Sequence, residues 1–171
     1  MKTATRTESI PARRRVFLVD QFPISRLAVC EWLKDTPDLS LCGEADSEEH
    51  AFKAVRHLQP DIVVTEVLRQ QDLGFIRGLH SRYPTLPILV FSFRDEEWYA
   101  PRALEAGADG FLMKGVSPSR LVAGIRAALD GRVVLSPEMR AQFLLKCTKR
   151  QNRPMAWRRG RSCRTSKNER D

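Results

Sequence analysis

Asp20, Glu66, Ser92 and Lys114 each stand at the end of a short apolar run, and together they offer carboxylates, a hydroxyl and an ammonium. If the four runs lie side by side in one sheet, this set forms a polar crevice that can bind a charged ligand. Taken singly, an acid or serine after a strand is an ordinary turn residue or helix cap. Their joint position therefore indicates a functional site, whereas no single residue does.

The apolar runs are continuous rather than alternating, which is typical of strands covered on both faces of a parallel sheet. The sequence predicts five strands, over residues 16–19, 39–42, 62–64, 88–91 and 111–113. Helical spacing of apolar residues is found between and after them, over residues 25–35, 46–58, 74–83, 101–107, 117–131 and 136–147. This alternation predicts an α/β fold, a doubly wound five-stranded parallel sheet with flanking helices. The polar strand ends are expected to meet at its carboxyl edge.

Pro101 is expected in the first turn of the short fourth helix, because proline suits that position. Trp98 and Tyr99 then precede the helix as candidates for exposed contacts, and the alternative is that one of them packs under the loop. The histidines are expected in helical segments away from the carboxyl edge, at His50, His57 and His80.

The net charge of +8 is concentrated near the C-terminus. Residues 140–171 carry 11 Lys and Arg against 2 acids, whereas residues 1–139 carry 18 against 19. The composition divides the chain into a flexible basic N-terminus (1–13), a near-neutral globular domain (14–134), a linker helix (135–147) and a basic disordered tail (148–171).

No apolar run approaches the roughly 18–20 residues that a membrane span needs, and Met1–Arg15 lacks the apolar segment of a secretory signal. The expected location is therefore cytoplasmic. The four cysteines show no CxxC spacing and are expected to be reduced and structural. Neither a glycine-rich phosphate loop after the first strand nor a Cys/His pair is found, so the sequence does not favour an enzyme.

Four segments carry a resemblance to a known family: VFLVDQFP at 16–23, QPDIVVTE at 59–66, LPILVFS at 86–92 and RALEAGADGFLMK at 102–114. They resemble the receiver (CheY-like) domain of two-component response regulators, especially the NarL/FixJ (LuxR-type) subfamily, over about residues 14–139. The resemblance implies a flavodoxin-like fold and phosphorelay signalling. In that family an aspartate after the third strand accepts a phosphoryl group from a histidine kinase.

The resemblance also assigns roles to residues of this chain. Asp20 matches an acid that helps to hold Mg²⁺. Ser92 and Lys114 match the hydroxyl and ammonium that contact the phosphoryl group, and Phe111 matches an aromatic that changes rotamer on activation.

Two positions depart from the family pattern. Gln21 replaces a second acid of the pocket, and Glu66 stands at the position of the phosphoacceptor aspartate. Mg²⁺ prefers carboxylates and waters in octahedral geometry, so Asp20 and Glu66 are expected to bind it weakly at most, and no other cofactor is expected. Glu66 is one methylene longer than aspartate, and misplacing a nucleophile by about 1 Å costs about 10²-fold in rate. The sequence therefore predicts a non-enzymatic receiver domain that works without phosphorylation.

Glu66 has two interpretations. Its longer side chain moves negative charge toward the place of phosphoryl oxygens, where Lys114 can pair with it and Ser92 can donate to it. Glu66 then partly imitates the phosphorylated state, although an exposed Glu–Lys pair contributes only about 0–1 kcal/mol. The alternative is that the site has decayed and Glu66 is a solvated acid.

The resemblance implies protein partners, namely a histidine kinase or an output protein, and a homodimer. Regulators of this subfamily continue into a DNA-binding helix-turn-helix domain, whose apolar pattern is not found after residue 147. Cations that neutralise phosphates and a tryptophan that can stack on a base make the tail a candidate for nucleic-acid binding. The candidate residues are Lys149, Arg150, Arg153, Trp157, Arg158, Arg159 and Arg161.

The basic tail has two further interpretations. Either it has no role, or it is the product of a frameshift or truncation that replaced a helix-turn-helix domain. For the whole chain, the alternative function is a LuxR-type DNA-binding transcriptional regulator.

Overall fold

The computed structural model of the protein describes residues 13–151, except for the side chains of residues 70, 144 and 146–151. Five strands form one sheet in the order β2-β1-β3-β4-β5, and all neighbouring strands are parallel. Their bounds are β1 Arg14–Val19, β2 Leu39–Ala45, β3 Ile62–Thr65, β4 Ile88–Ser92 and β5 Gly110–Met113. The predicted parallel sheet is confirmed.

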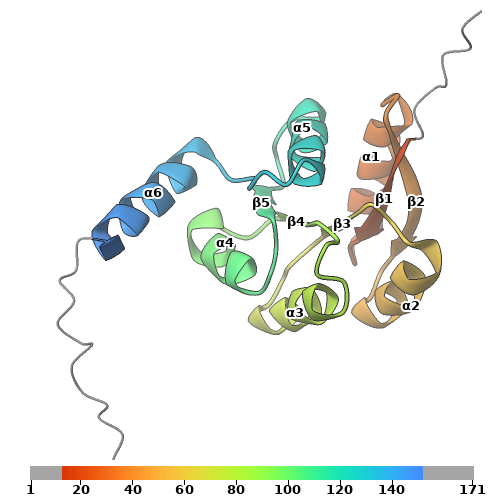
Figure 1. Ribbon diagram of the computed structural model, residues 1–171. Coiled ribbons are helices and arrows are strands. Elements are labelled where there is room, and N and C mark those ends of the chain that lie inside the picture. The colour runs from red at the N-terminus through yellow and green to blue at the C-terminus, as the bar shows by residue number, and fades with distance from the viewer. Residues whose placement is uncertain (1–12, 152–171) are drawn as a thin grey trace, which may run out of the picture. The chain divides into compact units, whose positions relative to one another are not determined.

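Helices cover both faces of this sheet, which confirms the doubly wound α/β fold. The helices are α1 Pro23–Lys34, α2 Glu48–Leu58, α3 Leu73–Arg82, α4 Glu96–Glu105, α5 Pro118–Leu129 and α6 Pro137–Gln151, with a short 3₁₀ helix η1 at Gln70–Asp72. Figure 1 shows α1 and α5 on one face and α2, α3 and α4 on the other. Because consecutive parallel strands are joined by helical crossovers, all five strands end at the same edge.

The core explains why the apolar runs are continuous. Every residue of β3 and of β4 is buried, because each of these strands has helices on both faces. On the face of α1 and α5, Leu89 packs in a cluster with Val64, Leu121 and Ile125, all fully buried. Burial on both sides leaves no position for an alternating polar residue until the strand ends.

The fourth helix differs from the prediction. It begins at Glu96, and Pro101 lies inside it rather than in its first turn. Asp95 is the N-cap, since its Oδ1 accepts a hydrogen bond from the Glu97 amide at 2.8 Å. A capping side chain followed by two acids stabilises a helix start, and this outweighs the one hydrogen bond that an internal proline removes.

Trp98 and Tyr99 therefore lie within α4 and not before it. Trp98 is 65% exposed, whereas Tyr99 is partly buried and its ring lies 5.9 Å from the Arg94 guanidinium.

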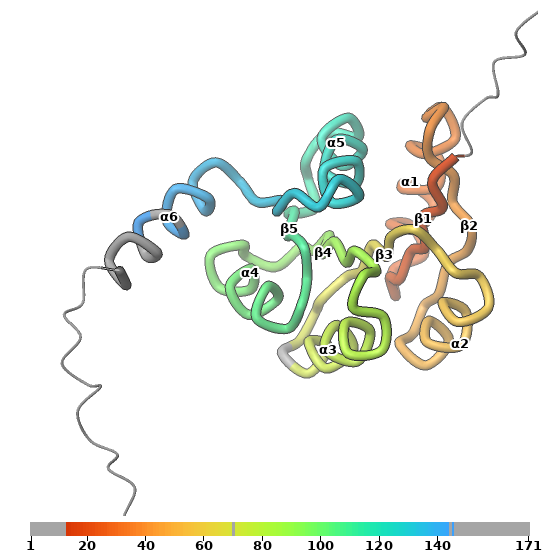
Figure 2. Tube along the Cα trace, in the orientation of Figure 1, coloured from red at the N-terminus to blue at the C-terminus, as the bar shows by residue number. Residues whose placement is uncertain are grey.

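The chain divides into two compact units, residues 1–136 and 137–171. Helix α6 begins two residues after the expected start of the linker helix and continues to Gln151, past the expected boundary at 147. Lys149, Arg150 and Gln151 are strong helix formers, which explains the extension. The other candidates for nucleic-acid contacts lie outside the described residues (Figure 2): Arg153, Trp157, Arg158, Arg159 and Arg161.

A membrane-spanning helix is not found among the described residues, where no helix combines sufficient length with sufficient hydropathy.

The central strand provides a test of the core. Leu89→Ala removes a fully buried side chain from β4 and is expected to lower the free energy of unfolding by about 2–5 kcal/mol. Leu27→Ala makes the same chemical change at a site on α1 that is 56% exposed, and is expected to change it by no more than about 0.5 kcal/mol. Urea unfolding of both full-length variants measures the difference. Equal losses would contradict the described position of β4.

Candidate functional site

The carboxyl edge of the sheet places three of the predicted residues at the ends of β1, β3 and β5. The Asp20 amide donates to the Ala45 carbonyl at 3.0 Å and the Glu66 amide donates to the Val19 carbonyl at 2.8 Å. The Lys114 amide donates to the Ser92 carbonyl at 2.6 Å. Each residue thus continues the hydrogen-bond ladder of its strand, so the sheet itself fixes where the side chains start.

Asp20, Glu66 and Lys114 form a buried ion triad. The Lys114 Nζ lies 2.7 Å from Glu66 Oε2 and donates a hydrogen bond to Asp20 Oδ2. The side chains of Asp20, Glu66 and Lys114 are 2%, 3% and 4% exposed, respectively. One ammonium therefore joins the ends of β1, β3 and β5 out of contact with water.

The remaining carboxylate oxygens are held by the backbone. Asp20 Oδ1 accepts from the Phe22 amide and Glu66 Oε1 accepts from the Val67 amide, both at 2.8 Å. Glu66 Oε2 contacts the ammonium as an ion pair but lies outside hydrogen-bond geometry. Both carboxylates are thus fixed at two points, which orients them toward Lys114.

The expectation for Ser92 is wrong in one respect. The Ser92 hydroxyl is fully buried, but it donates to the Val67 carbonyl at 2.8 Å and accepts from the Arg94 amide at 3.0 Å, and its Oγ bonds neither oxygen of Glu66. Two backbone groups in the neighbouring loops satisfy the hydroxyl, so Glu66 is held by Lys114 and the Val67 amide and not by Ser92.

The Lys114–Glu66 ion pair is buried, whereas an exposed pair was expected. The Glu66 side chain is 3% exposed, so Glu66 is not a solvated acid. The small free energy expected for an exposed Glu–Lys pair therefore does not apply. Breaking a buried pair by removing one partner typically costs about 3–5 kcal/mol, because the other charge stays buried. Phe111, the position of the family's switch aromatic, is fully buried.

An acidic hollow of about 210 Å³ opens beside the ion triad. Its charged and amide lining comes from Asp20, Gln21, Asp46, Glu48, Glu66, Arg69 and Asp72. Burial raises the pKa of the Glu48 carboxyl, and the nearby Asp72 raises it further. Four of the five acids of the lining come from three strand-to-helix connections, and Glu48 begins α2.

The position of one histidine also differs from the expectation. His50 Nδ1 lies 3.0 Å from Asp46 Oδ1, and this hydrogen bond lowers the pKa of the Asp46 carboxyl. Since Asp46 lines the acidic hollow, His50 lies near the carboxyl edge rather than away from it.

The residues of this site do not fit a magnesium ion. Mg²⁺ requires oxygen ligands at near-ideal octahedral positions, but the Lys114 ammonium occupies one oxygen of Asp20 and one of Glu66. Gln21 contributes no charge to the hollow. In residues 13–151, no group of three or more His, Cys, Asp or Glu side chains is arranged to hold a metal.

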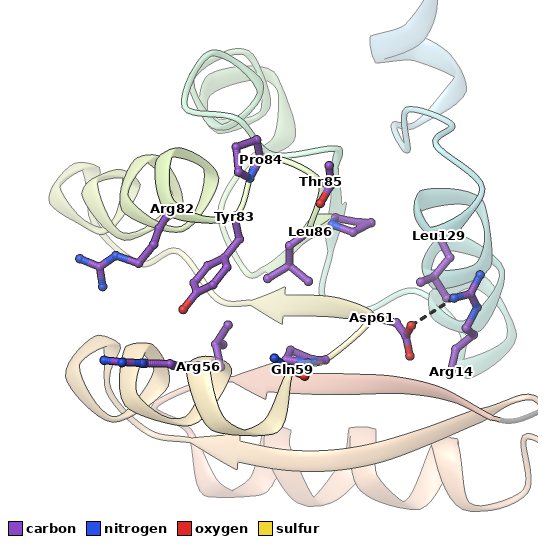
Figure 3. A pocket seen from close by; sticks show the side chains of 13 residues that line it. Arg14, Arg56, Gln59, Asp61, Arg82, Tyr83, Pro84, Thr85, Leu86 and Leu129 are labelled. Atoms are coloured by element: carbon purple, nitrogen blue, oxygen red, sulfur yellow. Dashed lines mark hydrogen bonds and ion pairs between the residues drawn. The ribbon is translucent and has the colours of Figure 1, made fainter.

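A hollow larger than the acidic one lies at the opposite edge of the sheet. It measures about 860 Å³, and Figure 3 shows the Arg14–Asp61 ion pair on one side and Arg56 and Arg82 on the other. These residues lie near the amino ends of the strands and the carboxyl ends of α2 and α3. Ligands of open α/β sheets bind at the carboxyl edge, so the ion triad marks the candidate site.

Further residues near the site were not predicted, among them Arg69, which also lines the acidic hollow. Asp46, Glu48 and Asp72 line the acidic hollow, and Phe22 and Phe93 lie beside Lys114. An acid after the second strand and an aromatic directly after a polar strand end are the signals in the sequence that could have found them.

A parallel sheet in the order 2-1-3-4-5, with acids and a lysine at the ends of β1, β3 and β5, defines a receiver-type α/β domain. The family model for the response regulator receiver domain matches residues 16–126. The chain therefore belongs to the receiver domain family of two-component response regulators.

The similar proteins agree with this membership. Response regulator GacA of Pseudomonas viridiflava is 31% identical over 135 residues, which are 77% of this chain and 63% of that protein. The nitrate/nitrite response regulator NarL of Escherichia coli K12 is 29% identical over 123 residues, 71% of this chain and 57% of NarL. The crystal structure of a LuxR-family response regulator from Aurantimonas sp. SI85-9A1 matches with a TM-score of 0.72 and 28% identity, over 80% of this chain and 99% of that one.

The match spans less than two thirds of the length of these curated relatives. What the comparisons support for this chain is a receiver domain of two-component signalling, the class of domain that interacts with histidine kinases and output domains.

The ion triad provides the second prediction. Lys114→Met leaves two carboxylates buried without a cation and is expected to lower the free energy of unfolding by about 3–5 kcal/mol. Adding Asp20→Asn and Glu66→Gln removes the uncompensated charges and is expected to restore part of the loss. Urea unfolding of the full chain measures both effects.

Lys53→Met is the control, since Lys53 is exposed and pairs with Glu49 on the same helix. A loss for Lys114→Met no larger than for Lys53→Met would contradict the buried ion triad.

Proposed function

We propose that this receiver domain transmits its signal through protein contacts without phosphorylation at Glu66. The observation that carries the proposal is the buried contact of 2.7 Å between Lys114 Nζ and Glu66 Oε2. The ammonium that would stabilise a phosphoryl group is already paired with a carboxylate at the acceptor position.

Three features of the site support the proposal. Attack on phosphorus needs a carboxylate oxygen in line with the leaving group, and both Glu66 oxygens are held by Val67 and Lys114. Charge on the transferred group needs cations, but the Asp20 oxygens are held by Phe22 and Lys114 and do not fit Mg²⁺. The acidic hollow beside them repels a phosphate donor.

Glu66 imitates only part of the phosphorylated state. It supplies the ion pair to Lys114, but one carboxylate has one charge and two oxygens, whereas a phosphoryl group has up to two charges and three oxygens. The Ser92 hydroxyl bonds Val67 rather than Glu66, so that contact is missing from the imitation. We therefore infer a shifted population of signalling states rather than a fully locked one, since about 1.4 kcal/mol changes such a ratio tenfold.

The output of the domain is protein binding and not catalysis. Helix α4 presents Trp98 at 65% exposure, a side chain typical of the energetic centre of interfaces. A histidine kinase or output protein, a homodimer and a cytoplasmic location remain predictions. A nucleic-acid role of the basic tail, and a transcriptional regulator as the whole protein, remain alternatives that rest on the sequence and on the relatives.

The acceptor position can be tested with acetyl phosphate. In wild type, no phosphoryl group is expected to move from acetyl phosphate to Glu66. Gln21→Asp with Glu66→Asp shortens the acceptor and adds an acid for Mg²⁺, and is expected to form an acyl phosphate while acetate leaves. Intact-mass spectrometry of the full chain, followed by peptide mapping, measures the adduct.

The matched control is Gln21→Asp with Glu66→Asn, which has the same pocket without a nucleophile. A stable adduct on wild-type Glu66, from acetyl phosphate or from a phosphorylated histidine kinase, would contradict the proposed function. Saturable NMR shifts near Ser92 with beryllofluoride and Mg²⁺ in wild type would contradict it as well.

A further inference from the structure

The Lys114 ammonium lies near three aromatic rings as well as the two carboxylates. Its Nζ is 4.9 Å from the ring centre of Phe93, 5.6 Å from that of Phe22 and 5.7 Å from that of Phe91. Phe22 and Phe93 meet edge to face, with ring centres 6.2 Å apart. The ammonium is thus enclosed between two carboxylates and three rings, which explains why the lysine side chain is only 4% exposed.

Two of these rings are not part of the core. Phe91, a residue of β4, is 3% exposed and belongs to the core. Phe22 is 37% exposed and Phe93 is 63% exposed. Large apolar side chains gain little from burial at such exposure, so packing alone does not account for their position. Both contact the ammonium, and a cation over an aromatic face is attracted to it.

We propose that Phe22 and Phe93 form an aromatic cap that keeps phosphate donors away from Lys114, as a second barrier to phosphorylation that is separate from Glu66. This inference rests on the proposed function and names residues that regulate access to the same site. The cap keeps the phosphate donor away before any phosphoryl transfer, whereas Glu66 makes the acceptor position itself unsuitable.

The surroundings of the cap indicate why a phosphate donor is excluded. The rings border an apolar hollow of about 300 Å³, whose lining includes Phe22, Phe93 and Lys114 itself. A phosphate dianion that crosses this surface loses hydration before it reaches a cation. On the other side of the triad lies the acidic hollow, which repels it. The apolar hollow has no charged lining residue other than Lys114 itself, and the acidic hollow has one cation, Arg69, against five acids.

Chemical labelling of lysines tests the cap without any phosphorylation. Reductive methylation with formaldehyde and a borohydride is carried out on the full chain, and peptide mass spectrometry gives the rate at Lys114 relative to exposed Lys53 in the same molecule. Lys114 is expected to react far more slowly than Lys53 in wild type. Phe93→Ala and Phe22→Ala are each expected to raise the relative rate about threefold or more, by loss of one cation–π contact and of its shielding.

Two variants distinguish a specific effect of the rings from a general increase in the accessibility of Lys114. Ile24→Ala changes an exposed residue of the same hollow that has no aromatic ring to offer the ammonium, and is expected to leave the relative rate unchanged. Phe93→Leu keeps apolar volume but removes the ring, and is expected to give an intermediate rate. Equal rates at Lys114 and Lys53 in wild type, or an equal effect of Ile24→Ala and Phe93→Ala, would overturn the cap.

The barrier itself is tested in the Gln21→Asp, Glu66→Asp background with acetyl phosphate. Adding Phe93→Ala is expected to raise the rate of adduct formation about tenfold, because the donor then reaches Lys114. If Phe93→Ala leaves the rate of adduct formation unchanged, the cap is not a barrier to phosphate donors, even where the same variant raises the labelling rate of Lys114. The proposed function fails by a different result, namely an adduct on wild-type Glu66.

Discussion

One ammonium shared by two buried carboxylates is the interaction on which the carboxyl edge of this domain depends. Lys114 joins Asp20 and Glu66, and so the ends of β1, β3 and β5 are held by one cation. Taking three charges out of water is costly, and the cost is offset only when the geometry and the remaining hydrogen bonds are good. The strand ladders and the amides of Phe22 and Val67 provide that geometry, so the ion triad is as much a product of the backbone as of the side chains.

The fold and the members of this triad could be predicted from the sequence, because both follow from repeated local signals. Continuous apolar runs indicated the buried parallel strands, and parallel strands necessarily end at one edge, where Asp20, Glu66 and Lys114 are found. The partner of Ser92 could not be predicted, since it depends on the course of the loop after β3, which presents the Val67 carbonyl to the hydroxyl. The start of α4 was missed because Pro101 is a strong local signal, while the Asp95 cap that outweighs it is a weaker one.

The burial of Glu66 bears on whether the acceptor position has decayed. A decayed position is free to accept any side chain that water can solvate. The Glu66 side chain is instead 3% exposed. Together with Asp20, it pairs with the Lys114 ammonium, whose side chain is 4% exposed. An uncharged residue at position 66 would remove a carboxylate partner of that lysine, and an apolar one would also remove the acceptor of the Val67 amide. The acid at this position therefore has a structural function even where a phosphoryl group is not transferred.

The surfaces on both sides of the ion triad disfavour the binding of anions. The acidic hollow disfavours anions by charge, and the rings of Phe22 and Phe93 disfavour them by desolvation. In a receiver domain that is phosphorylated, a cation in the acidic hollow would offset the first effect, but here Lys114 already occupies the carboxylate oxygens that would bind it. The site is thus net negative without a phosphoryl group, since one ammonium faces two carboxylates. Under the proposed function, the signal enters through contacts that shift the loops after β3 and β4, where Ser92 and Arg94 bond the carbonyls of Val67 and Leu68.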